Sequence, residues 1–389
     1  MRNCQYTVNR HIVFVLALSF LSLLSPAGYP GAGESPAEIE ILKKVGSRSI
    51  QQALSDTGDL DETAKRVGID RQELEQLCRI LSIDLSSYQK QVSVPADPVS
   101  LEKFSSADYE PSVIVDYNST SPYILIVEKS THKIFVIKHR NGKSTLEGVF
   151  ECKTGKNHGD KTQEGDHKTP EGIFFLVDKY DRAKITRLVG KSNAYQYGDM
   201  AFVTNFPTDI DKLNKKNGSG IWLHGTDEDF LNTPLDDTRG CVVTTNETIQ
   251  ILYNYIKLRV TPLIIVETLD FLDRDDYAAQ RKQFRATLEG WRTAWQDKQI
   301  DEYIGYYSPL FTNNGRNREA YRNYKDNSIF KRVTINHIEL DNIIMLKHKG
   351  SMIIQFMQDY SASNLSSRKQ KTLYFVKAGD SWKIVAEKI

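Results

Sequence analysis

Residues 122–267 contain short runs of β-branched and aromatic residues separated by Gly, Asn and Pro. This sequence pattern constrains the fold more than any other. Runs such as "PYILIVEK", "HKIFVIKH", "GIFFLVDKY" and "PLIIVE" have the length and composition of strands. One helix interrupts them, since "TTNETIQILYNYIKL" offers Thr244 as N-cap and Glu247 three residues later, a capping box. The pattern predicts a mainly β domain over residues 121–268.

A different order of elements follows in residues 275–389. Apolar side chains at helical spacing form one stripe of a long helix, and a short helix around residues 303–307 comes next. The segments "VTINHIELDN", "IIMLKHKG", "MIIQFMQDY", "KTLYFVKAG" and "WKIVAEKI" then read as strands. Helices followed by an antiparallel sheet indicate an α+β domain. Trp291 and Trp295, which lie in the helical stripe, are predicted to belong to its core.

The N-terminal residues have the layout of a secretory signal peptide. Arg2 and Arg10 precede an apolar run of 13 residues, Ile12–Leu24, which is shorter than the roughly 20 residues needed to cross a bilayer as a helix. We expect residues 1–27 to be removed after Ala27, with export to the periplasm or cell envelope and no stable membrane insertion after cleavage. An uncleaved anchor is the alternative.

Residues 34–90 are predicted to form a small helical domain, followed by a polar, proline-bearing linker over residues 91–120. The helical part resembles a helix-turn-helix, with Gly68 in the turn and Asp70 capping the second helix. It holds eight Lys/Arg against eleven Asp/Glu, and Glu73 and Glu75 on the second helix would repel phosphate. We therefore expect packing or a homodimer from this domain and no nucleic-acid partner.

Export would leave three cysteines, an odd number in a compartment that oxidises thiols. Cys78 in a helix and Cys152 on a strand are expected to be structural, with a disulfide between them as an alternative. Cys241 opens the run "CVV", and His224 ends the run "GIWLHG". Strand ends can meet, so these two residues are candidates for a base and a thiol nucleophile. A thiolate at neutral pH is expected, because a neighbouring imidazolium and a following helix both lower a thiol pKa.

At these residues the chain resembles the L,D-transpeptidase catalytic-domain family, whose motif is a histidine, a spacer, and then Ser/Thr, His, Gly, Cys and an apolar residue. The matching residues are His224, Thr238, Gly240, Cys241 and Val242. The segment "TPEG" at 169–172, leading into an aromatic strand, is also typical of the family. Arg239 stands where histidine is common, as in a carboxypeptidase-like subgroup. The resemblance covers about residues 120–268.

The resemblance implies an enzyme that acts on peptidoglycan stem peptides without a cofactor or metal. Cys241 would be acylated at the diaminopimelate–D-Ala bond, with His224 as base and its ring held by the Gly225 carbonyl. The backbone N–H groups of Gly240 and Cys241 would form the oxyanion hole. Contacts to substrate are expected from three further residues: Arg239, Trp222 and Thr238. Transfer to a second stem amine ranks slightly ahead of hydrolysis, and a wall-binding module without activity is the non-enzymatic alternative.

Residues 275–389 resemble the nuclear-transport-factor-2-like domains, which are cone-shaped folds that often bind ligands. The order of all segments is similar to that of the cell-shape-determining L,D-carboxypeptidases, which favours hydrolysis. One loop contains several acidic and histidine residues, which are possible metal ligands. Their spacing fits no tight zinc pattern, and a hydrophilic loop that lines the substrate groove explains this composition better. These residues are His158, Asp160, Glu164, Asp166 and His167.

Overall fold

The computed structural model describes residues 50, 51, 54, 60–67, 74, 78, 83, 102–104, 106, 108–230 and 232–389. The chain divides into two compact units, Met1–Val92 and Ser93–Ile389. In the first unit, helix α3 (Leu60–Val67) is described, as is the buried Cys78. The predicted signal peptide and the residues Gly68, Asp70, Glu73 and Glu75 lie outside the described residues. Within the part of the chain that is described, no helix is long and apolar enough to cross a membrane.

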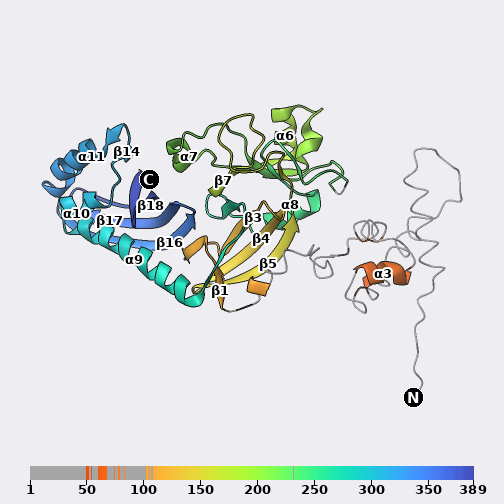
Figure 1. Cartoon of the computed structure of the whole chain (residues 1–389), viewed down its shortest axis with the longest axis horizontal. Coiled ribbons are helices and arrows are strands. Elements are labelled where there is room, and N and C mark those ends of the chain that lie inside the picture. Colours follow the sequence, from red (N-terminus) through yellow and green to blue (C-terminus); the bar gives the residue numbers. More distant parts are fainter. Residues whose placement is uncertain are drawn as a thin grey trace, which may run out of the picture. The chain divides into compact units, whose positions relative to one another are not determined.

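A sheet of eight strands dominates the first half of the second unit (Figure 1). Its spatial order is β11-β9-β8-β7-β12-β3-β4-β5, with bounds β3 (Tyr123–Glu128), β4 (Lys133–Arg140), β5 (Lys143–Glu151), β7 (Gly172–Asp181), β8 (Met200–Thr204), β9 (Trp222–His224), β11 (Val242–Val243) and β12 (Pro262–Val266). Two short strands, β6 (Thr154–Gly155) and β10 (Asp236–Thr238), pair in parallel outside it. The mainly β fold predicted from the sequence is thus present.

The prediction of a single helix in this domain was wrong. Besides α8 (Asn246–Tyr253), the structure has α6 (Arg182–Val189), a 3-10 turn η1 (Ala194–Tyr197) and α7 (Asp209–Leu213). η1 and α7 are too short to give a clear helical period in the sequence, whereas α6 is as long as α8 but follows β7 without a break.

The predicted N-cap of α8 was also wrong. Thr245 caps the helix, and its Oγ1 accepts from Thr248 N at 3.1 Å. Thr244 is fully buried and instead donates its hydroxyl to the Glu151 carbonyl oxygen at 2.9 Å. Tyr253, the last residue of this helix, is 43% exposed.

The second sheet has the order β19-β18-β17-β16-β2. Its bounds are β2 (Ile114–Tyr117), β16 (Ile335–His348), β17 (Ser351–Ala362), β18 (Leu365–Ala378) and β19 (Ser381–Lys388). Two predicted strands, 333–342 and 343–350, are therefore one continuous strand, β16. Part of the predicted linker was also wrong, because β2 joins this sheet and β1 (Tyr109–Pro111) pairs with β13 (Phe271–Asp273).

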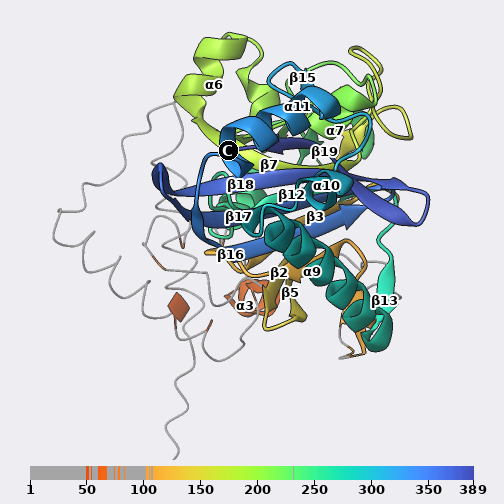
Figure 2. The same ribbon diagram turned by 90° about the vertical axis from the view of Figure 1, so that its left-hand side faces the viewer.

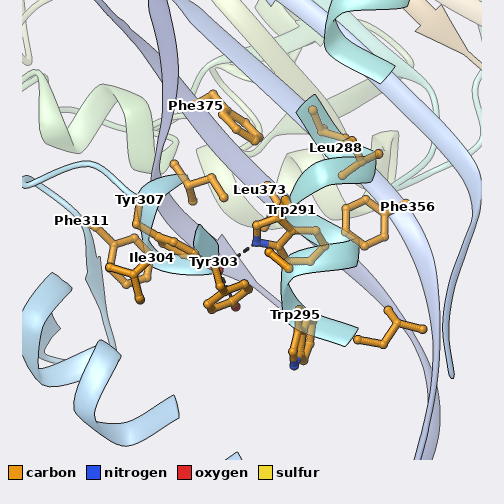
Figure 3. Packing of buried hydrophobic residues seen from close by; sticks show 14 of the residues in the cluster. Leu288, Trp291, Trp295, Tyr303, Ile304, Tyr307, Phe311, Phe356, Leu373 and Phe375 are labelled. Carbon is orange, nitrogen blue, oxygen red and sulfur yellow. Dashed lines mark hydrogen bonds between the residues drawn. The ribbon is translucent and has the colours of Figure 1, made fainter. Parts of the chain in front are cut away.

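Helices cover one face of this second sheet (Figure 2). They are α9 (Arg274–Gln296), α10 (Ile300–Gly305) and α11 (Arg318–Lys325), the last continuing into a π turn η2 (Asp326–Phe330); a small ribbon, β14 (Thr312–Asn313) and β15 (Arg316–Asn317), lies between α10 and α11 in sequence. Trp291 and Trp295 are buried in the core beneath α9, as predicted, and Trp291 Nε1 donates to the Tyr307 hydroxyl at 3.1 Å (Figure 3).

The opposite face of the second sheet packs against the eight-stranded sheet. Alternate residues along its strands divide between two cores: Met345, Ile354 and Phe375 face the helices, while Leu346, Ile353 and Tyr374 meet β3 residues of the other sheet. A strand buried on both faces must be apolar at every position. This explains the unbroken runs "IIML" and "LYFV", and it makes the two sheets one packed body.

Candidate active site

His224, the last residue of β9, and Cys241, directly before β11, line the same pocket of about 810 Å³. β9 and β11 are parallel, with Val243 opposite His224 and Val242 opposite Leu223. This register places Cys241, which directly precedes β11, level with Trp222 and two residues from His224 along the neighbouring strand at the edge of the sheet. The loop between them folds back through β10, so 17 positions of sequence separation close into one site.

The ring of His224 is held in one orientation. Its Nδ1 lies 2.7 Å from the Gly225 carbonyl oxygen, which can only accept, so Nδ1 carries the proton and Nε2 is a free acceptor. The side chain is buried, and burial lowers the pKa of His224 to about 4, although the Gly225 carbonyl partly offsets this shift. The imidazole is therefore neutral near pH 7 and able to take a proton.

The Cys241 thiol is protonated near neutral pH. Burial raises its pKa to about 11, while a hydrogen bond from the Trp222 backbone N–H and the cations Arg239 and Lys161 partly counteract the shift. Its Sγ donates to the Gly220 carbonyl oxygen at 3.4 Å. The expectation of a resting thiolate was therefore wrong, since a neutral His224 supplies no positive charge. The pair instead resembles a thiol with an adjacent general base.

The turn before Cys241 is fixed by Thr238. Its hydroxyl donates to the Cys241 carbonyl oxygen at 2.8 Å and accepts from Gly240 N at 3.1 Å. The Gly240 N–H predicted for the oxyanion hole is therefore directed to Thr238, which corrects that prediction. The Cys241 N–H remains as the candidate donor. Thr238 lines the pocket, but its hydroxyl serves the turn.

Gly240 has φ +124°, and an added Cβ would meet the Lys168 carbonyl oxygen at 2.7 Å and Ile221 Cδ1 at 3.1 Å. We expect Gly240→Ala to destabilise the fold by about 3 kcal/mol, because left-handed strain of roughly 1 kcal/mol adds to an overpacking cost of about 1–3 kcal/mol. Thermal unfolding measures the change. Gly190→Ala is the matched control, since Gly190 has φ +82° with open space around it; equal losses for both variants would contradict the clash.

Arg239 is among the residues that line the pocket, whereas Trp222 is not. Arg239 is exposed at the pocket mouth. The Trp222 ring packs edge-on against Tyr180, with ring centroids 5.3 Å apart, and tilted against Tyr197, with centroids 5.2 Å apart. Its contact with substrate stays a prediction. Tyr197 lines the pocket, and its ring lies tilted against the ring of His224, with centroids 4.9 Å apart.

Tyr197 was missed by the sequence analysis because it belongs to η1, a turn without a motif. Burial raises the pKa of its hydroxyl, and the Cys241 sulfur adds to the shift, whereas the neighbouring Arg239 guanidinium opposes it. Tyr197 therefore connects the three functional positions: it touches the base, lies near the thiol and faces Arg239.

The acidic and histidine residues of the 158–167 loop do not converge on a metal site in the described part of the chain. Asp166 accepts from Lys161 Nζ at 2.7 Å and from the backbone N–H groups of Thr162, Gln163 and Lys168, which shape the loop around it. Glu164 and His167 line the pocket. The loop is thus one wall of the site.

The remaining thiol of this unit is structural. Cys152 follows directly after β5 and has no exposed surface; the alternative of a Cys78–Cys152 disulfide stays a prediction. Burial raises its pKa far above the usual value. The accessible thiol of the second unit is therefore Cys241.

A buried neutral imidazole and a thiol in one pocket, on a mainly β fold, define the class of thiol-dependent enzymes. The chain belongs to the L,D-transpeptidase catalytic-domain family of peptidoglycan-acting cysteine enzymes, and it carries a C-terminal nuclear-transport-factor-2-like domain. Residues 122–265 match the L,D-transpeptidase catalytic domain, and residues 283–388 match the Cds6 C-terminal NTF2-like domain.

Two solved structures share both domains. The Bdellovibrio bacteriovorus protein Bd1075 is 30% identical, with a TM-score of 0.63 over 72% of this chain and 98% of that one. Pgp2 from Campylobacter jejuni, described as a helical cell shape determining protein, is 24% identical, with a TM-score of 0.57 over 72% of this chain and 96% of Pgp2. None of the curated proteins matches the chain.

Proposed function

We propose that this protein cleaves the diaminopimelate–D-Ala bond of peptidoglycan tetrapeptide stems through a Cys241 acyl-enzyme. One observation carries the proposal: the unprotonated Nε2 of His224 and the thiol of Cys241 share one open pocket. A neutral base beside a neutral thiol is suited to attack on an amide, because the base can take the thiol proton as the sulfur reaches the carbonyl carbon.

The steps follow from these roles. The Sγ–C bond forms while His224 Nε2 takes the thiol proton, and the Cys241 N–H stabilises the oxyanion. The C–N bond to D-Ala then breaks, and His224 returns the proton to the leaving nitrogen. Water deprotonated by His224 attacks the thioester, the S–C bond breaks, the thiol regains its proton and the tripeptide carboxylate is released. A second stem amine in place of water would give a cross-link.

Charge near the sulfur favours hydrolysis over transfer. The carboxylates Glu164, Glu228 and Asp237 line the same pocket, but the charged groups that act on the Cys241 thiol are two cations, Arg239 and Lys161. They would attract the carboxylates of the stem, whereas an acceptor amine in its ammonium form would approach against them. The likeness in both domains to a cell shape determining protein adds support for a shape-related trimming role. Transfer, which the sequence ranked first, stays as the second candidate because the catalytic domain belongs to the transpeptidase family.

Purified tetrapeptide muropeptides are the test of this proposal. We expect the full-length protein to release D-Ala and accumulate tripeptides, which chromatography and mass spectrometry resolve. Cross-linked dimers as the main product would select transfer. If neither D-Ala nor a thioester on Cys241 appears, the proposed enzyme activity is wrong and the result favours the alternative of a wall-binding module without activity.

Replacing Arg239 by histidine, the residue common in the family, is expected to raise the ratio of cross-linked dimers to tripeptides several-fold. The physical reason is that the substitution removes a permanent cation from the mouth of the pocket. The product ratio at fixed conversion measures it. Arg187→His, a change on the partly exposed end of α6, is the control. An unchanged ratio in Arg239→His would show that this charge does not select the acceptor.

The proposed substrate places the protein in the periplasm or cell envelope after removal of residues 1–27, and a homodimer through residues 34–90 is proposed with it. We keep the domain limits 34–90, 121–268 and 275–389, with β2 assigned to the last domain by its sheet pairing.

A further inference from the structure

The β16–β17 hairpin of the C-terminal domain reaches the catalytic domain. Its turn is Lys349–Gly350, and Lys349 has φ +50°, as a tight two-residue hairpin requires. Lys349 Nζ donates to Glu171 Oε2 at 2.6 Å, and the His348 ring nitrogen lies 3.7 Å from the same oxygen. The hairpin tip thus ends on a carboxylate of the "TPEG" segment.

Glu171 is a buried anchor with partners on both sides. Its side chain is 3% exposed, and Lys129 Nζ donates to Oε1 at 3.0 Å. Burial alone would raise its pKa, but the His348 ring, which faces the carboxylate, and the hydrogen bonds from Lys349 and Lys129 outweigh burial and hold the pKa well below its usual range. The backbone N–H of Glu171 also donates to Asp160 Oδ1 at 2.8 Å, which closes the pocket-lining loop. Loss of Lys349 would therefore leave a buried negative charge short of one partner.

Two residues before Glu171, Thr169 binds the peptide that precedes the nucleophile. Its Oγ1 donates to the Gly240 carbonyl oxygen at 3.1 Å and accepts from Gly155 N at 2.8 Å. That carbonyl belongs to the same planar unit as the Cys241 N–H, and in a trans peptide the two groups point in opposite directions. Fixing the Gly240 oxygen therefore fixes the direction of the candidate oxyanion donor.

The segment between the two anchors is stiff. Pro170 has a locked φ and restricts the residue before it, so Thr169 and Glu171 move together. Thr169 is fully buried, which leaves it little freedom to relax. A displacement of Glu171 would thus reach the Gly240–Cys241 peptide.

We propose that Lys349 of the C-terminal domain is a positioning residue, which acts through Glu171 and Thr169 to orient the Gly240–Cys241 peptide in the catalytic pocket. The catalytic part of this inference rests on the proposed function. It assigns the C-terminal hairpin a part in turnover in addition to packing. The hairpin supplies no group to the substrate itself.

The test uses full-length Lys349→Ala, with Lys349→Arg as the conservative variant and Lys369→Ala as an exposed lysine of the same sheet. We expect Lys349→Ala to lower kcat for D-Ala release roughly three- to tenfold with KM nearly unchanged, less than the about hundredfold loss that a 1 Å misplacement can cause. Lys349→Arg should restore most of the rate. An unchanged kcat in Lys349→Ala, or an equal fall in Lys369→Ala, would overturn the proposal.

A second pair of variants tests the other end. Thr169→Val removes the donor to Gly240 at constant volume and is expected to lower kcat at least as much as Lys349→Ala does. Thr169→Ser keeps the hydroxyl and should retain activity.

Amide hydrogen exchange, read by mass spectrometry, separates this inference from the proposed function. In Lys349→Ala, exchange should rise in residues 156–171 and 238–243 even if no D-Ala is ever released. Unchanged exchange in both segments of the folded variant would contradict the connection.

Discussion

Cys241→Ala is expected to reduce D-Ala release from tetrapeptides by more than about 10³-fold, since loss of the nucleophile removes the acyl-enzyme route as a whole. The thioester adduct on the protein should disappear at the same time. Release of D-Ala by coupled assay and intact-mass spectrometry of the acylated protein are the two measurements.

Cys152→Ala is the matched control for this loss. Cys152 is fully buried after β5 and takes no part in the pocket, so its removal should reduce stability while turnover per folded molecule stays near the wild-type value. If Cys241→Ala retained activity, or if Cys152→Ala lost the thioester, the assignment of the nucleophile would be wrong.

His224→Gln is expected to lower kcat/KM by about 10² to 10⁴, the usual contribution of a positioned general base. Glutamine can keep a donor near the Gly225 carbonyl while it removes the accepting Nε2. His167→Gln is the control, because His167 lines the same pocket but lies on the loop wall. A similar loss in both variants would show that pocket shape, and not the base, was affected.

The pH dependence of the same variants follows from the two pKa values. Protonation of His224 removes the base, so kcat/KM should fall only as the pH drops towards about 4, and alkylation of Cys241 should still rise above pH 9 because its pKa is about 11. The free energy of unfolding should also fall with pH. The folded-state pKa of His224 lies below the unfolded value, so roughly 3 kcal/mol of stability is lost as the pH falls from about 6.5 to about 4. His224→Gln should remove that loss. An acid limb near pH 6 would instead indicate a thiolate–imidazolium pair.

Features written in local sequence were predictable. The strand runs of the catalytic domain, the long helix α9 and the pairing of His224 with Cys241 all follow from periodicity or from a spaced motif. Trp291 and Trp295 were placed in the core for the same reason, because their spacing puts them on one helix face.

Features that depend on tertiary packing were not predictable. The ionisation of Cys241 depends on how deeply the folded chain buries it, and Tyr197 reaches His224 only through the turn after α6. The sequence allows either Thr244 or Thr245 as the N-cap. In the fold Thr244 donates its hydroxyl to the Glu151 carbonyl oxygen, and Thr245 caps the helix. No spacing rule contains that information.

The strand β2 has a consequence for how the chain is made. Residues 114–117 leave the ribosome more than 200 residues before their partner β16, whose residues 344–346 pair with them. Until then β2 lacks the strand that pairs with it, and an unpaired strand of this kind invites aggregation. In the complete fold β2 is the end strand of its sheet and pairs with β16. A shortened chain that ends near residue 275 would lack β16, so premature termination would be expected to yield aggregates in place of an isolated catalytic domain.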